Sequence, residues 1–169
     1  MNTADIEKKK ILLTAFRGTS AELLLKDIKD YETLVLPNDK GKDSDLLIDK
    51  ISAYDYDYII SFGQKPNSKD KVHIETTARD GEVCLKTEFD YVLLQQIFIQ
   101  NGISAKLSSN AGTSFCNRLY WNGLRYLAEN QEKKRAKMVF VHVPFEKNIR
   151  EFESFKERIT RTIAMLLQQ

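Results

Sequence analysis

The first half of the chain alternates short apolar runs with segments of mixed polarity. Three runs, ILLTAF (11–16), ETLVLP (32–37) and YDYIISFG (56–63), are nearly continuous in apolar residues. Runs of this length are typical of strands that are buried on both faces. We therefore predict three buried strands in this part of the chain.

The segments between these runs have the spacing of amphipathic helices. Residues 21–29 and 45–54 repeat apolar side chains three or four positions apart. Thr19 followed three residues later by Glu22 is the pattern of a capping box, and Ser44 can cap the second helix. Strands that alternate with helices in this way predict a largely parallel sheet with helices on its faces.

The pattern changes to a period of two over residues 71–87. Asp80-Gly81 lies at the centre of this stretch, and this dipeptide is a strong signal for a two-residue hairpin turn. Such a turn pairs Arg79 with Glu82. We therefore predict one β-hairpin here.

Beyond the hairpin, the spacing predicts three more helices and two more strands. Gly102 suits the C′ position of the first of these helices, where a left-handed backbone is common. These elements are a helix over 87–101, a strand over 103–109, a helix capped by Thr113 or Ser114, a strand over 138–145 and a helix over 150–168. The whole chain, 1–169, is predicted to be one α/β domain, a three-layer α/β/α sandwich with a mostly parallel mixed sheet and one β-hairpin.

The composition excludes several classes of protein. The net charge of +2 is too small to indicate nucleic-acid binding, and we expect the basic run KKRAK (133–137) to be a solvated loop. No apolar run has the length of a membrane span or the features of a signal peptide. Two cysteines do not make a disulfide framework, and no His/Cys cluster indicates zinc. We therefore expect free thiols, a cytoplasmic location and no metal.

Cys116 is predicted to lie in the first turn of its helix. Unpaired N–H groups and the positive end of the helix dipole stabilise a thiolate there, so we expect a lowered thiol pKa. The same N–H groups can hold an oxyanion beside the sulfur, and the small residues of NAGTS let a substrate approach the main chain. The alternative is that Cys116 is a small buried apolar residue.

His142 is the candidate base for this thiol. It lies near the C-terminal end of the strand over 138–145, and ligands of open α/β sheets collect at that edge. We expect Cys116, at the start of the helix after the strand over 103–109, to lie at the same edge. The alternative is a histidine that is hydrogen-bonded beneath a neighbouring loop.

A second thiol and imidazole need separate consideration. The predicted hairpin places His73, Glu75 and Cys84 on one face, where they form another possible thiol–imidazole–carboxylate set. A thiol in the middle of a strand, however, lacks the helix terminus that stabilises a thiolate. For Glu75 the alternatives are an ion pair with Lys86 across the hairpin or the orientation of a catalytic histidine.

Four segments, in order along most of the chain, resemble one known family. SSNAGTSFCNRLYWNGLRYL is similar to a TAGT-x-x-CN run before a helix, and FVHVPF is similar to a strand ending in x-HVP. DYIISFGQ resembles a strand ending in GQ or GL, and VHIETTA resembles a V-E-x-x-A segment. These are motifs of the pyroglutamyl peptidase I (pyrrolidone-carboxylate peptidase) family of cysteine peptidases.

The resemblance implies an α/β/α fold and removal of an N-terminal pyroglutamyl or related blocked residue through a thioester acyl-enzyme. Carried over by position, Cys116 is the nucleophile, His142 the general base and acid, and Glu75 the residue that orients the imidazole. No cofactor is implied; the expected partner is a small peptide or blocked amide, and a homo-oligomer is possible. The substrate-binding residues implied are Phe16, Gln64, Asn110, Ala111, Gly112 and Phe115.

The chain departs from the family pattern around the substrate. The family's first strand leads into GF-x-PFGG and then Asn-Pro-Ser, whereas this chain reads TAFRGTSAELLL. KPNSK stands where the family has a Gly-Gly-Arg turn, and the hairpin replaces a longer covering insertion. Two alternatives therefore stay open: a non-catalytic or differently specific relative that binds a partner, and a resemblance that is purely ancestral.

Overall fold

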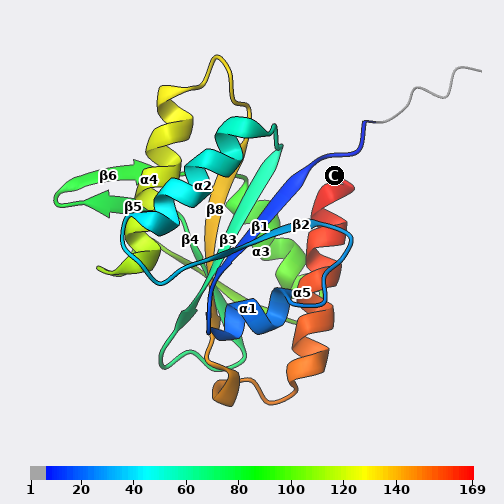
Figure 1. The fold of residues 1–169 in the computed structure, drawn as a ribbon. Helices are drawn as coiled ribbons and strands as arrows, with labels where there is room; N and C mark the ends of the chain where they lie inside the picture. The colour runs from blue at the N-terminus through cyan, green and yellow to red at the C-terminus, as the bar shows by residue number, and fades with distance from the viewer. Residues whose placement is uncertain (1–6) are drawn as a thin grey trace, which may run out of the picture.

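The computed structural model describes residues 7–169, which form a six-stranded sheet covered by helices on both faces (Figure 1). The strand order is β2-β1-β3-β8-β4-β7. The bounds of these strands are β1 Ile11–Phe16, β2 Glu32–Leu36, β3 Tyr58–Lys65, β4 Lys71–Glu75, β7 Ser104–Ser108 and β8 Lys137–Pro144. Strands β1, β2, β3 and β8 are parallel, while β4 is antiparallel to β8 and parallel to β7. The predicted three-layer sandwich with a mostly parallel mixed sheet is confirmed.

Two apolar clusters define the layers on either side of the sheet. One joins the sheet to three helices, through residues such as Leu24, Phe98 and Ile159, and the other joins it to two helices, through Leu47 and Leu119. The helices of the first layer are α1 Ser20–Leu25, α3 Tyr91–Gln100 and α5 Phe152–Leu167, and those of the second are α2 Lys42–Ala53 and α4 Phe115–Glu129. A short 3₁₀ helix, η1 (Glu146–Asn148), follows β8.

The period-two stretch divides into two parts at Thr76. Residues before it enter the main sheet as β4, whereas β5 (Thr77–Asp80) and β6 (Val83–Lys86) form a separate hairpin that projects beside α4 (Figure 1). The predicted turn is wrong by one residue, because Asp80 pairs with Val83 and Gly81-Glu82 are the central residues. Gly81 has φ of 60°, the conformation that a type II′ turn requires at its first central position.

The helix starts were predicted with mixed success. Thr19 caps α1 by accepting a hydrogen bond from the N–H of Glu22, as predicted, although the Glu22 carboxylate accepts from Gly18 N–H rather than from the cap residue (2.8 Å). Ser44 does not cap α2, which begins at Lys42 with Gly41 as its N-cap residue. Helix α3 starts at Tyr91 and not at 87, because the Asp90 side chain accepts from Leu93 N–H and caps it there.

The strand that precedes α4 does not end at the C-terminal edge of β8. Strand β7 runs in the opposite direction to β8. Ser108, the last residue of β7, lies level with Glu75 and hence with Phe140 in the middle of β8. The loop over 109–114 then carries the chain onward, and Cys116 in the first turn of α4 lies over Gly63, which pairs with His142.

The basic run at 133–137 is tied to the body of the protein. Lys134 forms an ion pair with Asp55 (3.0 Å), and Arg135 forms one with Asp57 (3.0 Å). Within residues 7–169, no helix is long and apolar enough to cross a membrane.

Candidate active site

The antiparallel pairing of β4 with β8 joins an imidazole to a carboxylate inside the sheet layer. His142 pairs with His73 and Phe140 pairs with Glu75, so alternation places the side chains of His142 and Glu75 on the same face. The Nδ1 of His142 and Oε1 of Glu75 form a hydrogen bond at 2.8 Å. Glu75 is 0% exposed and His142 is 5% exposed, so this hydrogen bond is shielded from water.

This bond determines which nitrogen of the imidazole carries the proton. An ionised carboxylate only accepts hydrogen bonds, so the neutral ring must hold its proton on Nδ1. The other nitrogen, Nε2, is then left with a lone pair that can accept a proton from a neighbouring acid. The pair therefore has the arrangement of a general base and the group that orients it.

Glu75 also has a cationic neighbour that the hairpin register did not suggest. Lys65, at the end of β3, lies 3.6 Å from the same Oε1 atom, whereas Lys86 pairs with Thr77 on the hairpin. The predicted alternative, a Glu75–Lys86 ion pair, is therefore wrong. The other carboxylate oxygen, Oε2, is buried and has no hydrogen-bond partner within the described residues.

Cys116 lies in the first turn of α4, as predicted, and its sulfur sits over the backbone of Gly63. A Cβ atom built on Gly63 would lie 2.7 Å from the Cys116 sulfur and 2.8 Å from Cζ of Phe140. Gly63 pairs directly with His142 in the β3–β8 register. Because neighbouring strands are about 4.8 Å apart, the thiol and the imidazole are neighbours on one face.

The thiol and the imidazole do not share a hydrogen bond in this structure. Among residues 7–169, the imidazole of His142 forms its side-chain hydrogen bond through Nδ1, and the partner is Glu75 rather than Cys116. The ring of Phe140 lies beside the imidazole, with centroids 4.9 Å apart, and it also reaches Gly63 next to the sulfur. Such bonds are often long or absent in substrate-free enzymes.

The expected lowering of the Cys116 pKa is wrong for this structure. Burial, together with the negative charges of Glu75 and Asp43, raises the pKa of the thiol to about 12. The backbone N–H of Cys116 itself opposes this rise but does not overcome it. The resting sulfur is therefore a neutral thiol and not a preformed thiolate.

Asp43 is a buried carboxylate that the sequence did not single out. It is 0% exposed in the first turn of α2, where Oδ1 accepts from the N–H groups of Ser44 (2.6 Å) and Gly41 (3.2 Å). Its Oδ2 is buried with no partner inside the described part of the chain. Its charge opposes formation of the thiolate at Cys116.

The start of α4 leaves backbone donors close to the sulfur. Ser114 is the N-cap residue and forms no side-chain cap bond, while Arg118 N–H is the first to bond back into the helix, to Ser114. The N–H groups of Phe115, Cys116 and Asn117 precede that bond and are the donors that a helix N-terminus leaves open. They are suited to holding an oxyanion formed at the sulfur.

The predicted substrate-binding residues divide into three groups. Phe16 and Phe115 form an edge-to-face pair with centroids 6.4 Å apart. The Oε1 atom of Gln64 accepts from Ser20 N–H (3.0 Å), which ties this side chain to the start of α1. In the loop before α4, Ala111 is buried, and Gly112, with φ of 90°, donates its N–H to Oδ1 of Asn110 (3.0 Å).

The second thiol–imidazole set is not assembled. Cys84 is exposed on β6, where it pairs with Arg79 and its sulfur accepts from the Arg79 guanidinium at 2.8 Å. His73 instead lies in the main sheet opposite His142, with its Nδ1 buried and without a partner in the described residues. Burial and the charge of Lys65 lower the pKa of His73.

These features together define a class of protein: an α/β/α sandwich with a thiol at a helix N-terminus beside an imidazole–carboxylate pair is the architecture of a cysteine hydrolase. The pyroglutamyl peptidase family matches residues 66–154, which is more than half of the chain. The chain belongs to this family.

Similar proteins span most of the sequence. The chain is 29% identical to a pyrrolidone-carboxylate peptidase of Fusobacterium nucleatum, over 81% of this chain and 78% of that protein. It is 28% identical to the pyrrolidone-carboxylate peptidase of Staphylococcus carnosus, over 80% and 78% of the two chains. The fold is that of pyroglutamyl peptidase I from Bacillus amyloliquefaciens, with a TM-score of 0.81 at 17% identity over 95% of this chain and 98% of the other.

Sequence reasoning missed three residues that shape the site. Gly63 is the last residue of the predicted strand over 56–63, and a glycine in a strand can mark the close approach of another group. Phe140 resembles any core aromatic residue in the sequence. Asp43 lies in a polar run, where nothing distinguishes it from the exposed Asp45.

The close approach of Cys116 to Gly63 predicts that a larger residue at position 63 destabilises the folded protein. We expect Gly63→Ala to lower the free energy of unfolding by about 1–3 kcal/mol, because the new methyl group has no space. Urea denaturation measures this cost. In a Cys116→Ala background the cost should be smaller, because the sulfur has been removed and only Phe140 remains. Equal costs in both backgrounds would contradict the described geometry.

The buried charge of Asp43 predicts an effect on thiol reactivity. In a Cys84→Ser background, Asp43→Asn should lower the pKa of Cys116, so alkylation by iodoacetamide at mildly alkaline pH should become faster. Asp45→Asn, at an exposed position of the same helical turn, is the matched control and should leave the rate unchanged. An unchanged or slower rate in folded Asp43→Asn protein would show that this charge does not act on the sulfur.

Proposed function

We propose that this protein removes an N-terminal pyroglutamyl residue from peptides, with Cys116 as nucleophile, His142 as general base and acid, and Glu75 as the residue that orients His142. The observation that carries the proposal is the buried His142–Glu75 hydrogen bond at 2.8 Å on the face where the Cys116 sulfur lies. Family membership supports the same reaction.

The first step is attack of sulfur on the carbonyl carbon of the scissile amide. Because burial keeps Cys116 protonated, the thiol proton moves to Nε2 of His142 as the carbon–sulfur bond forms. The imidazolium is stabilised by the Glu75 carboxylate through the Nδ1–H bond. The negative charge that develops on the carbonyl oxygen is held by N–H groups at the start of α4.

The second step releases the amine and then the acyl group. His142 donates its proton from Nε2 to the leaving nitrogen, the carbon–nitrogen bond breaks, and a thioester remains on Cys116. A water molecule that transfers a proton to His142 attacks the thioester, and the sulfur recovers the proton as the acid is released. The peptide substrate is thus the partner, and no cofactor takes part in these steps.

The acyl group is proposed to lie against the aromatic pair of Phe16 and Phe115. The half-buried Phe115, next to Cys116 and backed by the buried Phe16, offers an apolar wall for a flat lactam ring. The carbonyl of the Gln64 amide is engaged by Ser20, so the amide nitrogen of Gln64 is the end that can donate to a lactam carbonyl. Asn110, Ala111 and Gly112 would form the loop over this group.

The proposal predicts hydrolysis of pyroglutamyl-aminomethylcoumarin. Fluorescence release should be abolished in Cys116→Ala and should fall roughly a hundredfold or more in kcat/KM in Glu75→Gln, since the imidazole loses the charge that stabilises its protonated form. Glu88→Gln, an exposed acid outside the site, is the control and should retain full activity. Turnover that persists in Cys116→Ala would overturn the assignment of the nucleophile.

A non-catalytic binding protein is the second candidate. The observation that favours it is the neutral, buried thiol of Cys116, which is not preactivated as it is in many cysteine hydrolases. The same assay separates the two, because Cys116-dependent turnover rejects the binding protein. Failure to turn over any of a series of pyroglutamyl peptides, in protein that remains folded, would favour it.

A further inference from the structure

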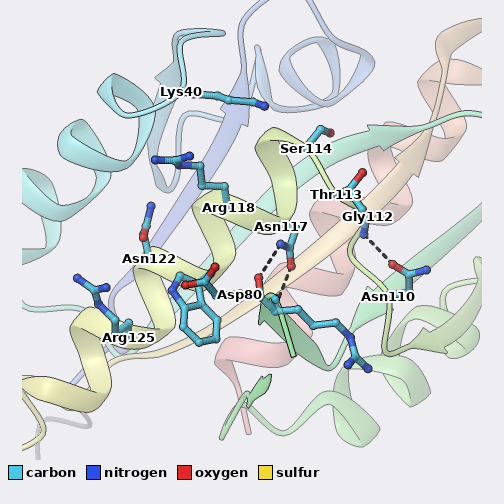
Figure 2. A pocket seen from close by; sticks show the side chains of 13 residues that line it. Lys40, Asp80, Asn110, Gly112, Thr113, Ser114, Asn117, Arg118, Asn122 and Arg125 are labelled. Atoms are coloured by element: carbon cyan, nitrogen blue, oxygen red, sulfur yellow. Dashed lines mark hydrogen bonds between the residues drawn. The ribbon is translucent and has the colours of Figure 1, made fainter. Parts of the chain in front are cut away.

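A cavity of about 600 Å³ lies beside the start of α4, on the side of the helix that faces away from the sheet (Figure 2). Its floor contains the half-buried side chains of Asn117, Trp121 and Asn122, which follow one another along one face of the helix. The tip of the β5–β6 hairpin and the loop before α4 form its other walls. The cavity shares Asn110 and Gly112 with the loop proposed to cover the acyl group, but its charged side chains take no part in the acyl-transfer steps.

The charges around the cavity are strongly unbalanced. Lys40, Arg79, Arg118 and Arg125 line it, and Asp80 is the carboxylate among its lining residues. The chain as a whole has 26 basic and 24 acidic residues, so this ratio is a local feature and not a reflection of composition. A concave surface lined by one sign of charge concentrates ligands of the opposite sign.

Most of these cations are not neutralised by the protein. Arg125 forms an ion pair with Glu129 (3.5 Å), but within residues 7–169 no carboxylate lies within 4.0 Å of the charged groups of Lys40, Arg79 or Arg118. The Lys40 ammonium lies 5.4 Å from the centre of the Phe115 ring, and the guanidinium of Arg79 donates to the Cys84 sulfur. These groups therefore keep their charge available for a ligand.

The cavity is held in place next to the thiol. The side-chain amide of Asn117 accepts from Arg79 N–H (2.9 Å) and donates to Arg79 C=O (2.9 Å), which fixes the hairpin to α4 (Figure 2). Asn117 directly follows Cys116, and Gly112 and Ser114 line the cavity just before it. A substrate that extends from the sulfur over the start of α4 would enter this basic cavity.

We propose that the basic cavity binds acidic side chains of the peptide portion that leaves, so that the protein selects peptides with Asp or Glu directly after the N-terminal blocked residue. This inference rests on the proposed function for its orientation relative to the scissile bond. The guanidinium groups of Arg79 and Arg118 pair with the carboxylates of the substrate. Trp121 packs against the apolar methylene groups of these acidic substrate side chains. The preference is a matter of specificity and does not alter the acyl-transfer chemistry.

The test measures binding separately from catalysis. Trp121 is the single tryptophan of the chain, so its fluorescence reports on the cavity. Protein with Cys116→Ala is titrated with pyroglutamyl-Glu-Glu-Ala-amide and with the matched pyroglutamyl-Gln-Gln-Ala-amide. We expect the acidic peptide to bind on the order of fivefold more tightly than the glutamine peptide at low ionic strength. This difference in affinity should be lost at about 1 M salt.

Variants identify the residues responsible. Arg79→Gln and Arg118→Gln should each reduce the preference for the acidic peptide, whereas Arg161→Gln, an exposed cation on α5 in the other helical layer, should not. Equal binding of the two peptides, or a preference that survives both substitutions, would overturn the proposal. Tighter binding of an RNA oligonucleotide than of the acidic peptide would assign the cavity to nucleic acid and would also overturn it.

The peptide-binding test of the cavity and the hydrolysis test of the proposed function can fail independently of each other. Hydrolysis of pyroglutamyl-aminomethylcoumarin with no preference between the peptides would leave the enzyme in place and reject the role of the cavity. Selective binding of the acidic peptide by a protein that hydrolyses nothing would reject the enzyme and retain the cavity as an acidic-peptide site.

Discussion

The hydrogen bond between His142 and Glu75 is the interaction on which the site depends. A fully buried carboxylate is tolerated because it is paired, and the pairing exists because β4 enters the sheet antiparallel to β8 and alternation directs both side chains to one face. Lys65 also lies close to the same carboxylate oxygen and supplies an opposite charge. The backbone carbonyl of Glu75 accepts from the Tyr120 hydroxyl (2.8 Å), so the strand that carries the acid is tied to the helix that carries the thiol.

The position of the sulfur follows from the absence of a side chain at Gly63. That absence leaves space that the Cys116 sulfur and the Phe140 ring occupy together, directly beside the strand of His142. The same close packing removes water from the thiol and raises its pKa to about 12. The packing that brings the thiol close to the imidazole therefore also contributes to the resistance of the thiol to ionisation.

Much of the architecture could be predicted from the sequence because burial leaves a direct pattern. The nearly continuous apolar run 11–16 predicts a buried strand. Small polar residues before Cys116, followed by apolar residues at helical spacing, predict that a helix starts just before Cys116. The register of the hairpin could not be predicted, since pairing Arg79 with Glu82 or with Cys84 places the same side chains on the same face. The direction of β7 could not be predicted, because the pattern of a strand does not give its direction. The protonation of Cys116 could not be predicted either, because it depends on burial beside Phe140 and on the charges of Glu75 and Asp43, which come from distant segments.

The most direct test of this account is the position of the proton on the His142 ring. The chain has two histidines, so a ¹⁵N–¹H correlation spectrum of the imidazoles, with His73→Gln used for assignment, resolves the ring of His142. The account predicts that the neutral ring carries a slowly exchanging proton on Nδ1, bonded to Glu75, and leaves Nε2 unprotonated. A neutral His142 ring with its proton on Nε2 would contradict it, because that nitrogen could not accept the proton of Cys116.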